Sequence, residues 1–183
     1  SLCMNTAPFM IYFGEEVGER GMDEEGFSGK DGRTTIFDWW SVASLRRLRK
    51  LIESGEYSSL DSRILVKHGL KKEEADAFIR FATAVRFAAS DEAVEKGCTY
   101  DLCYCNAGSD GFDKNRHYAF LRDHEDHTLL IVANFSSNDA RMNLRIPPHA
   151  FEWLKIQETD SLNSNSTISV EVGAYGCTVI TLI

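Results

Sequence analysis

The spacing of apolar residues divides the chain into two parts that meet near Gly97. Before that glycine, apolar residues recur every three or four positions, which is the period of an amphipathic helix. This pattern predicts one helix from about Ser41 to Gly55 and another from about Lys71 to Ala89. After Gly97 apolar and polar residues alternate, as they do in strands that bury one face. We therefore expect two domains, residues 1–97 and residues 98–183.

A series of short strands is predicted in the second part, each separated from the next by a stretch rich in Gly, Asn, Asp, Ser or Pro. Short strands at such close spacing are typical of an antiparallel β-sandwich. The predicted strands are Thr99–Cys105, His117–Arg122, Thr128–Phe135, Arg141–Ile146, Thr167–Val172 and Cys177–Ile183.

A different pattern lies near the start of the chain. The run from Phe9 to Phe13 is apolar at every position, which predicts a strand buried on both faces, as in parallel sheets covered by helices. Glu15, Glu16 and a Gly- and acid-rich stretch follow it directly. Ligands bind at the carboxyl ends of strands in parallel α/β folds, so this run predicts a barrel strand that leads into a site. A solvated connecting loop is the equally compatible alternative.

Composition and charge narrow the classes of partner. The chain has 183 residues and a net charge of −8, which argues against a nucleic acid partner. Its apolar runs are far shorter than the roughly 18 residues of a membrane helix. The five cysteines lack the spacing of a disulfide scaffold, which predicts free thiols and a cytoplasmic location. A predicted strand within ten residues of an initial Ser indicates a fragment of a longer protein.

The adjacent acids Glu15 and Glu16 suggest a catalytic pair. A retaining glycosidase holds its two carboxyl groups about 5–5.5 Å apart across the sugar bond. Neighbouring residues that leave a strand point to opposite faces, so at most one of these acids can face a site.

Several motifs resemble the α-amylase family of glycoside hydrolases. IYFGEEVGE and DGRTTIFDWWS resemble the last strand of the catalytic barrel and its following loop, although the family's Gly-x-Pro is replaced by Ala7-Pro8-Phe9. YAFLRDHEDHTLLIVANFS and SVEVGAYGCTVITLI resemble the β-sandwich that follows the barrel. The resemblance implies an α+β fragment: the terminal strand and helices of a TIM-type (β/α) barrel, then an antiparallel, Greek-key-like β-sandwich.

The resemblance also implies a function for the parent protein. That protein would hydrolyse or transfer α-glucosidic linkages by a retaining mechanism, with an α-glucan or malto-oligosaccharide as substrate and no cofactor or metal. The family's catalytic acids lie on earlier strands that are missing here, so the isolated chain is predicted to be inactive. The alternative is a non-catalytic carbohydrate-binding or structural module that recognises glucan through exposed aromatic residues.

The candidate substrate contacts lie at the rim of the implied barrel. They are Glu15 or Glu16, Arg33 and the aromatic face of Trp39. For the acids and Arg33, the alternative is a salt bridge that organises the loop. For Trp39 and its neighbour Trp40, the alternative, which we favour, is that they anchor the helix that begins at Ser41.

Two other motifs have plain structural interpretations. His124-Glu-Asp-His127 is predicted to be a solvated hairpin tip rather than a zinc site, which needs three or four firmly held ligands. Cys103 and Cys105 lie two apart on a predicted strand and are expected to be free thiols.

A strand taken from a closed barrel has two unpaired edges. We therefore expect residues 1–35 to be poorly ordered, to self-associate through the N-terminal strand, or to pair with the sandwich. The helix Lys71–Ala89 is expected to pack the face that carries Phe78 on the sandwich.

Overall fold

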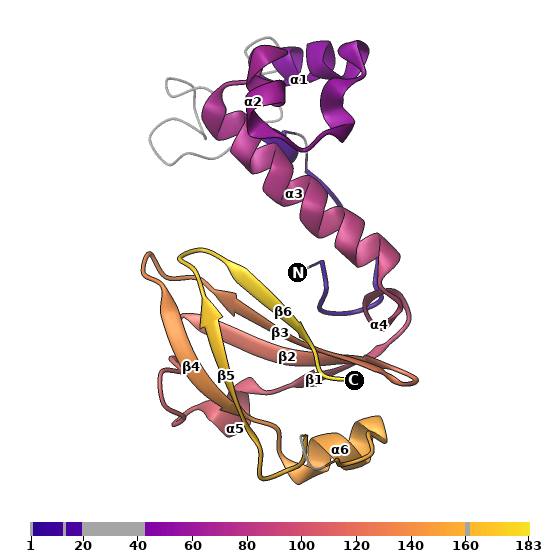
Figure 1. The fold of residues 1–183 in the computed structure, drawn as a ribbon, viewed down its shortest axis with the longest axis vertical. Coiled ribbons are helices and arrows are strands. Elements are labelled where there is room, and N and C mark those ends of the chain that lie inside the picture. Colours follow the sequence, from indigo (N-terminus) through magenta and orange to yellow (C-terminus); the bar gives the residue numbers. More distant parts are fainter. Residues whose placement is uncertain (1, 13, 20–42, 160–161) are drawn as a thin grey trace. The chain divides into compact units, whose positions relative to one another are not determined.

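The computed structural model describes residues 2–12, 14–19, 43–159 and 162–183. These residues form two compact units, one of Phe9–Phe87 and one of Ser1–Pro8 with Ala88–Ile183 (Figure 1). The second unit therefore combines Ser1–Pro8 with the chain from Ala88 onward, and Ala88 lies near the end of a long helix. The sequence had suggested a division at Gly97 instead. No helix in the described ranges is long and apolar enough to cross a membrane.

The first unit is helical. It holds α1 (Ala43–Ser54), α2 (Ser62–Lys67) and most of α3 (Lys72–Ser90), with 3-10 turns at Glu15–Val17 and Glu56–Ser58. Helices α1 and α3 confirm the two predicted helices. The buried core of this unit comprises Val17, Leu48, Leu51, Leu65, Leu70 and Ala75.

The packing of α3 differs from the prediction. Phe78 packs against the core of the helical unit, not on a sheet. An ion pair holds α3 to α1: the Arg47 guanidinium binds both carboxylate oxygens of Glu74, at 2.8 and 2.5 Å. Glu74 also accepts a hydrogen bond at 2.9 Å from the backbone N–H of Lys71, just before the helix. One carboxylate therefore caps α3 and fixes α1 beside it.

The predicted strand Phe9–Phe13 is wrong. Residues 9–12 have no regular secondary structure, and Met10 is 84% exposed. A strand needs a hydrogen-bonded neighbour, and none of the strands in the described ranges pairs with this segment. The sheets of the described residues are antiparallel, and no barrel fragment is formed by them.

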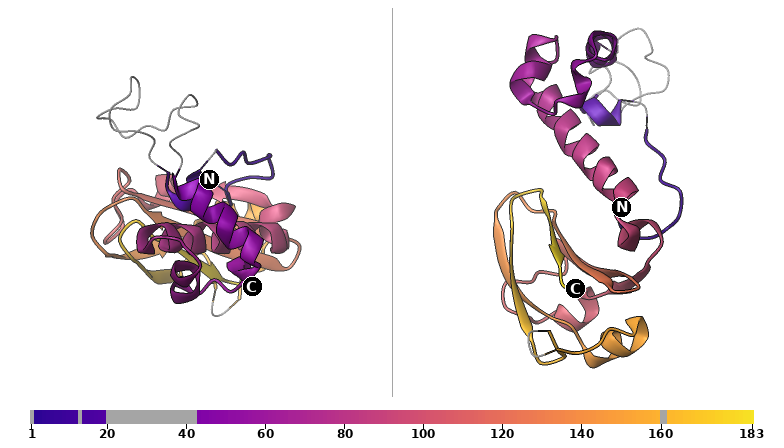
Figure 2. Two further views of the ribbon diagram at one scale, coloured as in Figure 1. Left: turned by 90° about the horizontal axis from the view of Figure 1, so that it is seen from above. Right: turned by 45° about the vertical axis from the view of Figure 1, so that its right-hand side comes forward.

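The second unit is an antiparallel sandwich, as predicted. One sheet has the order β1-β2-β3-β6 and the other pairs β4 with β5. Figures 1 and 2 show the two sheets packed together, with α5 and α6 near one end. The strands are β1 (Cys98–Asp101), β2 (His117–His124), β3 (His127–Asn134), β4 (Ala140–Arg145), β5 (Thr167–Val172) and β6 (Cys177–Thr181).

The strands face each other across a continuous apolar core. Leu121, Leu130 and Val132 are buried on the first sheet. Met142 and Leu144 are buried on the second, at exposures of 1% and 0%. Alternate residues of β4 and β5 are thus buried, as the sequence pattern predicted, whereas β2 and β3 are buried at nearly every position and so on both faces.

Short helices interrupt the sandwich where the sequence predicted strand or turn. The strand expected at Thr99–Cys105 ends at Asp101, whose carboxylate accepts a hydrogen bond at 2.7 Å from the backbone N–H of Cys103. Helix α5 (Cys103–Asn106) follows, so the two cysteines at 103 and 105 lie on a helix, not on a strand. Helix α6 (Pro148–Leu154) replaces a predicted turn.

A buried arginine explains why the second unit includes residues that precede Gly97. Arg122 on β2 is 1% exposed, and its guanidinium donates to the carbonyls of Ala93 and Val94 at 3.0 and 2.6 Å. These carbonyls belong to α4 (Glu92–Glu95). The same guanidinium donates to the carbonyl of Met4 at 3.5 Å. One side chain therefore joins α4 and the start of the chain to the sheet.

Candidate functional site

Of the predicted rim residues, Glu15 and Glu16 are among those that the structure describes. Glu15 and Glu16 lie in the 3-10 turn, where Glu15 is exposed and accepts a hydrogen bond at 3.1 Å from the backbone N–H of Tyr12. Arg33 and Trp39 lie outside the described residues, as does Trp40. The rim role of these residues stays a prediction.

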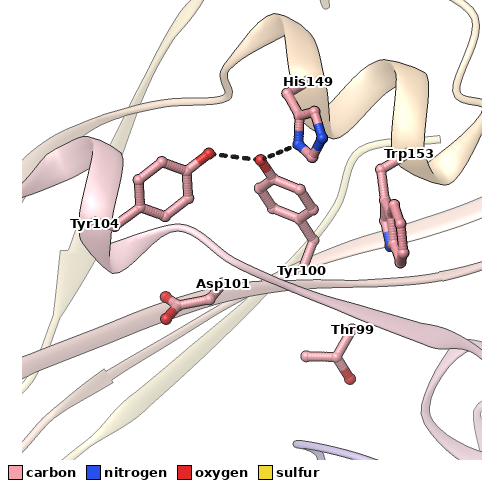
Figure 3. Close-up of a pocket in the computed structure, with 6 residues that line it drawn as sticks. All are labelled: Thr99, Tyr100, Asp101, Tyr104, His149 and Trp153. Atoms are coloured by element: carbon pink, nitrogen blue, oxygen red, sulfur yellow. Dashed lines mark hydrogen bonds between the residues drawn. The ribbon is translucent and has the colours of Figure 1, made fainter.

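A pocket on the sandwich unit is the better candidate. It is open to solvent, has a volume of about 370 Å³ and lies where β1, α5 and α6 meet (Figure 3). Most of its lining is aromatic. The lining residues are Thr99, Tyr100, Asp101, Tyr104, His149 and Trp153.

Helix α6 supplies two of the aromatic rings. Pro148 is at its first turn, a position that suits the fixed φ of proline. His149 and Trp153 are four residues apart and so share one face of the helix. Their rings are nearly parallel, with an interplanar angle of 23° and centroids 6.4 Å apart. The opposite side of α6 anchors the helix because Phe151 and Leu154 are buried in the sandwich core.

A hydrogen-bonded row of three side chains crosses the pocket. The Tyr100 hydroxyl lies 2.6 Å from the Tyr104 hydroxyl and 3.0 Å from Nδ1 of His149 (Figure 3). The three residues come from β1, α5 and α6, so the row also fixes these elements to one another. The ring of Tyr100 is buried between them, whereas Tyr104 is 62% exposed.

The charges of the pocket favour binding over proton transfer. Burial, together with the hydrogen bond to Tyr104, raises the pKa of Tyr100 far above its ordinary value. Tyr100 therefore stays protonated at neutral pH. Asp101 is the one carboxylate among the lining residues. A pair of carboxylates or a nucleophile with an adjacent base, which bond cleavage would need, is not part of this lining.

The described residues contain no group of three or more His, Cys, Asp or Glu side chains that could hold a metal ion. His124 and His127 of the β2–β3 hairpin belong to no such group.

The hairpin tip predicted at residues 124–127 is confirmed, with Glu125 in the left-handed conformation. His127, however, is not simply solvated, because its Nε2 lies 3.0 Å from a carboxylate oxygen of Asp91. This hydrogen bond raises the pKa of His127.

The sequence reasoning missed the pocket. Its lining comes from two segments about fifty residues apart that the fold brings together. One local signal was available: Pro148 can begin a helix, and His149 and Trp153 follow it at helical spacing.

Comparison with known proteins bears on the sandwich unit. Residues 112–182 match the family described as alpha amylase, C-terminal all-beta domain. Among solved structures, the chain is similar to the ligand-free form of cyclic alpha-maltosyl-(1→6)-maltose hydrolase from Arthrobacter globiformis, at 13% sequence identity and a TM-score of 0.34. That alignment covers 61% of this chain and 20% of the hydrolase, so the chain spans about a fifth of the length of the hydrolase. A search of curated proteins found no match.

Proposed function

We propose that the chain is the C-terminal part of a retaining glycoside hydrolase or transglycosylase of the α-amylase family that acts on α-glucans, since residues 112–182 match the C-terminal all-beta domain of alpha amylase. The match to this domain carries the proposal. It spans strands β2 to β6, which include most of the sandwich. The substrate of the whole protein would be an α-glucan or a malto-oligosaccharide.

The isolated chain would be inactive. Glu15 and Glu16 are adjacent in one turn and do not face each other across a space for a sugar. A retaining glycosidase needs two carboxyl groups about 5–5.5 Å apart on either side of the scissile bond. Catalytic acids supplied by an upstream domain would meet this need, with Glu15 or Glu16, Arg33 and Trp39 at the rim of that site.

The exposed segment at residues 9–12 supports a larger parent protein. Phe9, Met10, Ile11 and Tyr12 are all exposed, at 38%, 84%, 48% and 43%. Four consecutive large apolar side chains in water are costly, at about 25 cal/mol for each Å² that could be buried. Insertion of this segment between strands of a barrel would bury them. Self-association through the segment is the other way to cover it.

The test compares two proteins. The product of the full open reading frame, including any upstream sequence, is assayed on maltoheptaose and soluble starch beside the 183-residue chain. We expect reducing sugar or transfer products with retained anomeric configuration from the longer protein only. Activity of the 183-residue chain, or no α-glucan activity of a folded longer protein, contradicts the proposal.

A second candidate function is a non-catalytic glucan-binding module. The exposed Trp153 favours it, since aromatic ring faces bind the C–H faces of sugars. An open reading frame that ends without an upstream catalytic domain would select this alternative. The free state of all five cysteines supports a cytoplasmic location in either case.

A further inference from the structure

We infer that the pocket between β1, α5 and α6 is an accessory binding site for an α-glucan chain. The choice of an α-glucan rests on the proposed function, whereas the site itself rests on the geometry of the pocket. Its location is the non-catalytic sandwich unit, so it would hold substrate without taking part in bond cleavage.

The first argument is the aromatic platform. Trp153 is 63% exposed, a high value for the largest aromatic side chain, and its ring lies nearly parallel to that of His149. The face of an aromatic ring carries partial negative charge. The C–H groups on one face of a glucose ring carry partial positive charge and can stack on it. The two rings are stacked, and the exposed indole of Trp153 can contact a sugar unit.

The second argument is the set of polar atoms around this platform. Nδ1 of His149 is engaged by Tyr100, but Nε2 has no hydrogen-bond partner among the described residues, and the same holds for Nε1 of Trp153. The Asp101 carboxylate, one oxygen of which accepts the bond from the Cys103 N–H, adds an acceptor. The exposed hydroxyl of Tyr104 completes the set. Sugar hydroxyls both donate and accept, and they match this mixture of donors and acceptors.

The third argument is charge. The Asp101 carboxylate lies in the pocket, and the chain has a net charge of −8. An anionic ligand such as a phosphate or a nucleic acid would be repelled. A neutral polyhydroxyl compound has no such penalty. The pocket is also open, so an internal segment of a long chain could lie across it.

The pocket is held rigid before any ligand arrives. The Tyr104–Tyr100–His149 row fixes three of the rings, and the buried face of α6 fixes the backbone that carries Trp153. Little side-chain entropy would therefore be lost on binding. We expect a Kd of about 1 mM for maltoheptaose, a value typical of a small open contact area.

The experiment titrates maltoheptaose into the 183-residue chain and follows the backbone amide signals by NMR. Trp153→Ala should weaken binding about tenfold or more because it removes most of the platform. Tyr104→Phe keeps the ring but removes the hydroxyl, and should weaken binding by about threefold. Phe135→Ala is the matched control, since Phe135 is 68% exposed but does not line the pocket. Cellohexaose, a β-linked glucan, is the ligand control.

Binding of maltoheptaose that Trp153→Ala abolishes and Phe135→Ala leaves unchanged supports the inference. Absence of binding at 10-fold above the expected Kd of about 1 mM overturns it. Equal binding by Trp153→Ala, or equal binding of cellohexaose, also overturns it. Dimerisation of the chain that Trp153→Ala abolishes, without sugar binding, would assign the surface to a second copy instead. These outcomes do not depend on catalysis, so an inactive longer protein would contradict the proposed function and leave the binding result intact.

Discussion

The side-chain amide of Asn106 bonds both backbone groups of Arg145. Its Nδ2 donates to the Arg145 carbonyl at 3.0 Å, and its Oδ1 accepts from the Arg145 N–H at 2.9 Å. Nδ2 also donates to the carbonyl of Leu102 at 2.9 Å, and the whole residue is buried. The amide thus takes the place of a neighbouring strand at the end of β4 and attaches α5 to the second sheet.

Replacement of Asn106 by Asp should strongly destabilise the sandwich unit. The change removes the two N–H donors of Nδ2, so the carbonyls of Leu102 and Arg145 keep only the weak Cys105 thiol as a side-chain donor. We expect the free energy of unfolding to fall by about 3 kcal/mol. Urea denaturation measures this change. Asn115→Asp, at an exposed position, is the control and should be nearly neutral, and a similar loss in both variants would contradict the role given to Asn106.

The ion pair of His127 and Asp91 predicts a pH dependence of stability. Asp91 raises the pKa of His127 in the folded state, so folding favours the protonated imidazole. The stabilisation is full below the ordinary pKa of about 6.5 and is lost as the pH rises through the higher folded value. His127 is partly exposed, which limits the effect to about 1 kcal/mol or less.

The comparison that isolates this effect uses Asp91→Asn, which keeps an oxygen to cap α4. The stability difference between the unchanged protein and this variant should shrink as the pH is raised from about 6 to about 8. Asp126→Asn is the control, because Asp126 is an exposed acid in the β2–β3 turn next to His127. The stability difference between the unchanged protein and this variant should not change with pH. A constant difference between the unchanged protein and Asp91→Asn would show that the pair does not titrate.

Removal of the Glu74 carboxylate should loosen the helical unit. Glu74→Ala leaves Arg47 and the N–H of Lys71 without their acceptor, and we expect a loss of about 2–3 kcal/mol at pH 7. Glu73→Ala removes the exposed acid next to it and should cost far less. Thermal unfolding monitored by circular dichroism at 222 nm would compare the two, and equal midpoints would refute the cap-and-pair role.

Gly97 is required for lack of space rather than for flexibility. A Cβ at this position would lie 2.3 Å from the carbonyl oxygen of Ala93 and 2.4 Å from that of Asp123, both backbone atoms. Gly97→Ala should therefore cost about 3 kcal/mol. At Gly108 a Cβ meets nothing within 4 Å, so Gly108→Ala is the control. Differential scanning calorimetry would measure both, and a normal midpoint for Gly97→Ala would contradict the close approach.

The sandwich could be predicted because its strands obey a local rule. Strands β4 and β5 alternate apolar and polar residues, and turn residues separate the strands from β2 to β6, so the bounds of β5 at Thr167 and Val172 could be given from the sequence. The same rule failed after Asp101, because the carboxylate of that residue accepts a hydrogen bond from the N–H of Cys103, two residues on, and so turns the chain out of the strand. Such a local hydrogen bond is invisible to periodicity.

The structure of the N-terminal run and the presence of the pocket could not be predicted for another reason: both depend on contacts between parts of a protein that are distant in the sequence. Phe9 to Tyr12 have the composition of a buried strand, but a strand forms only beside a partner. The pocket needs Tyr100 and Trp153 to meet, and no spacing rule links two residues that far apart. Sequence patterns predict elements well and their assembly poorly.

The pocket does not coincide with the recognised domain. Tyr100 and Tyr104 precede Phe112, where the family match begins, whereas His149 and Trp153 lie inside it. A protein trimmed to the matched limits would lose one wall of the pocket and leave β2 with a bare edge. One wall of this cavity is therefore supplied by a segment outside the matched range, and a change in that segment would reshape the cavity without touching the strands that the match covers.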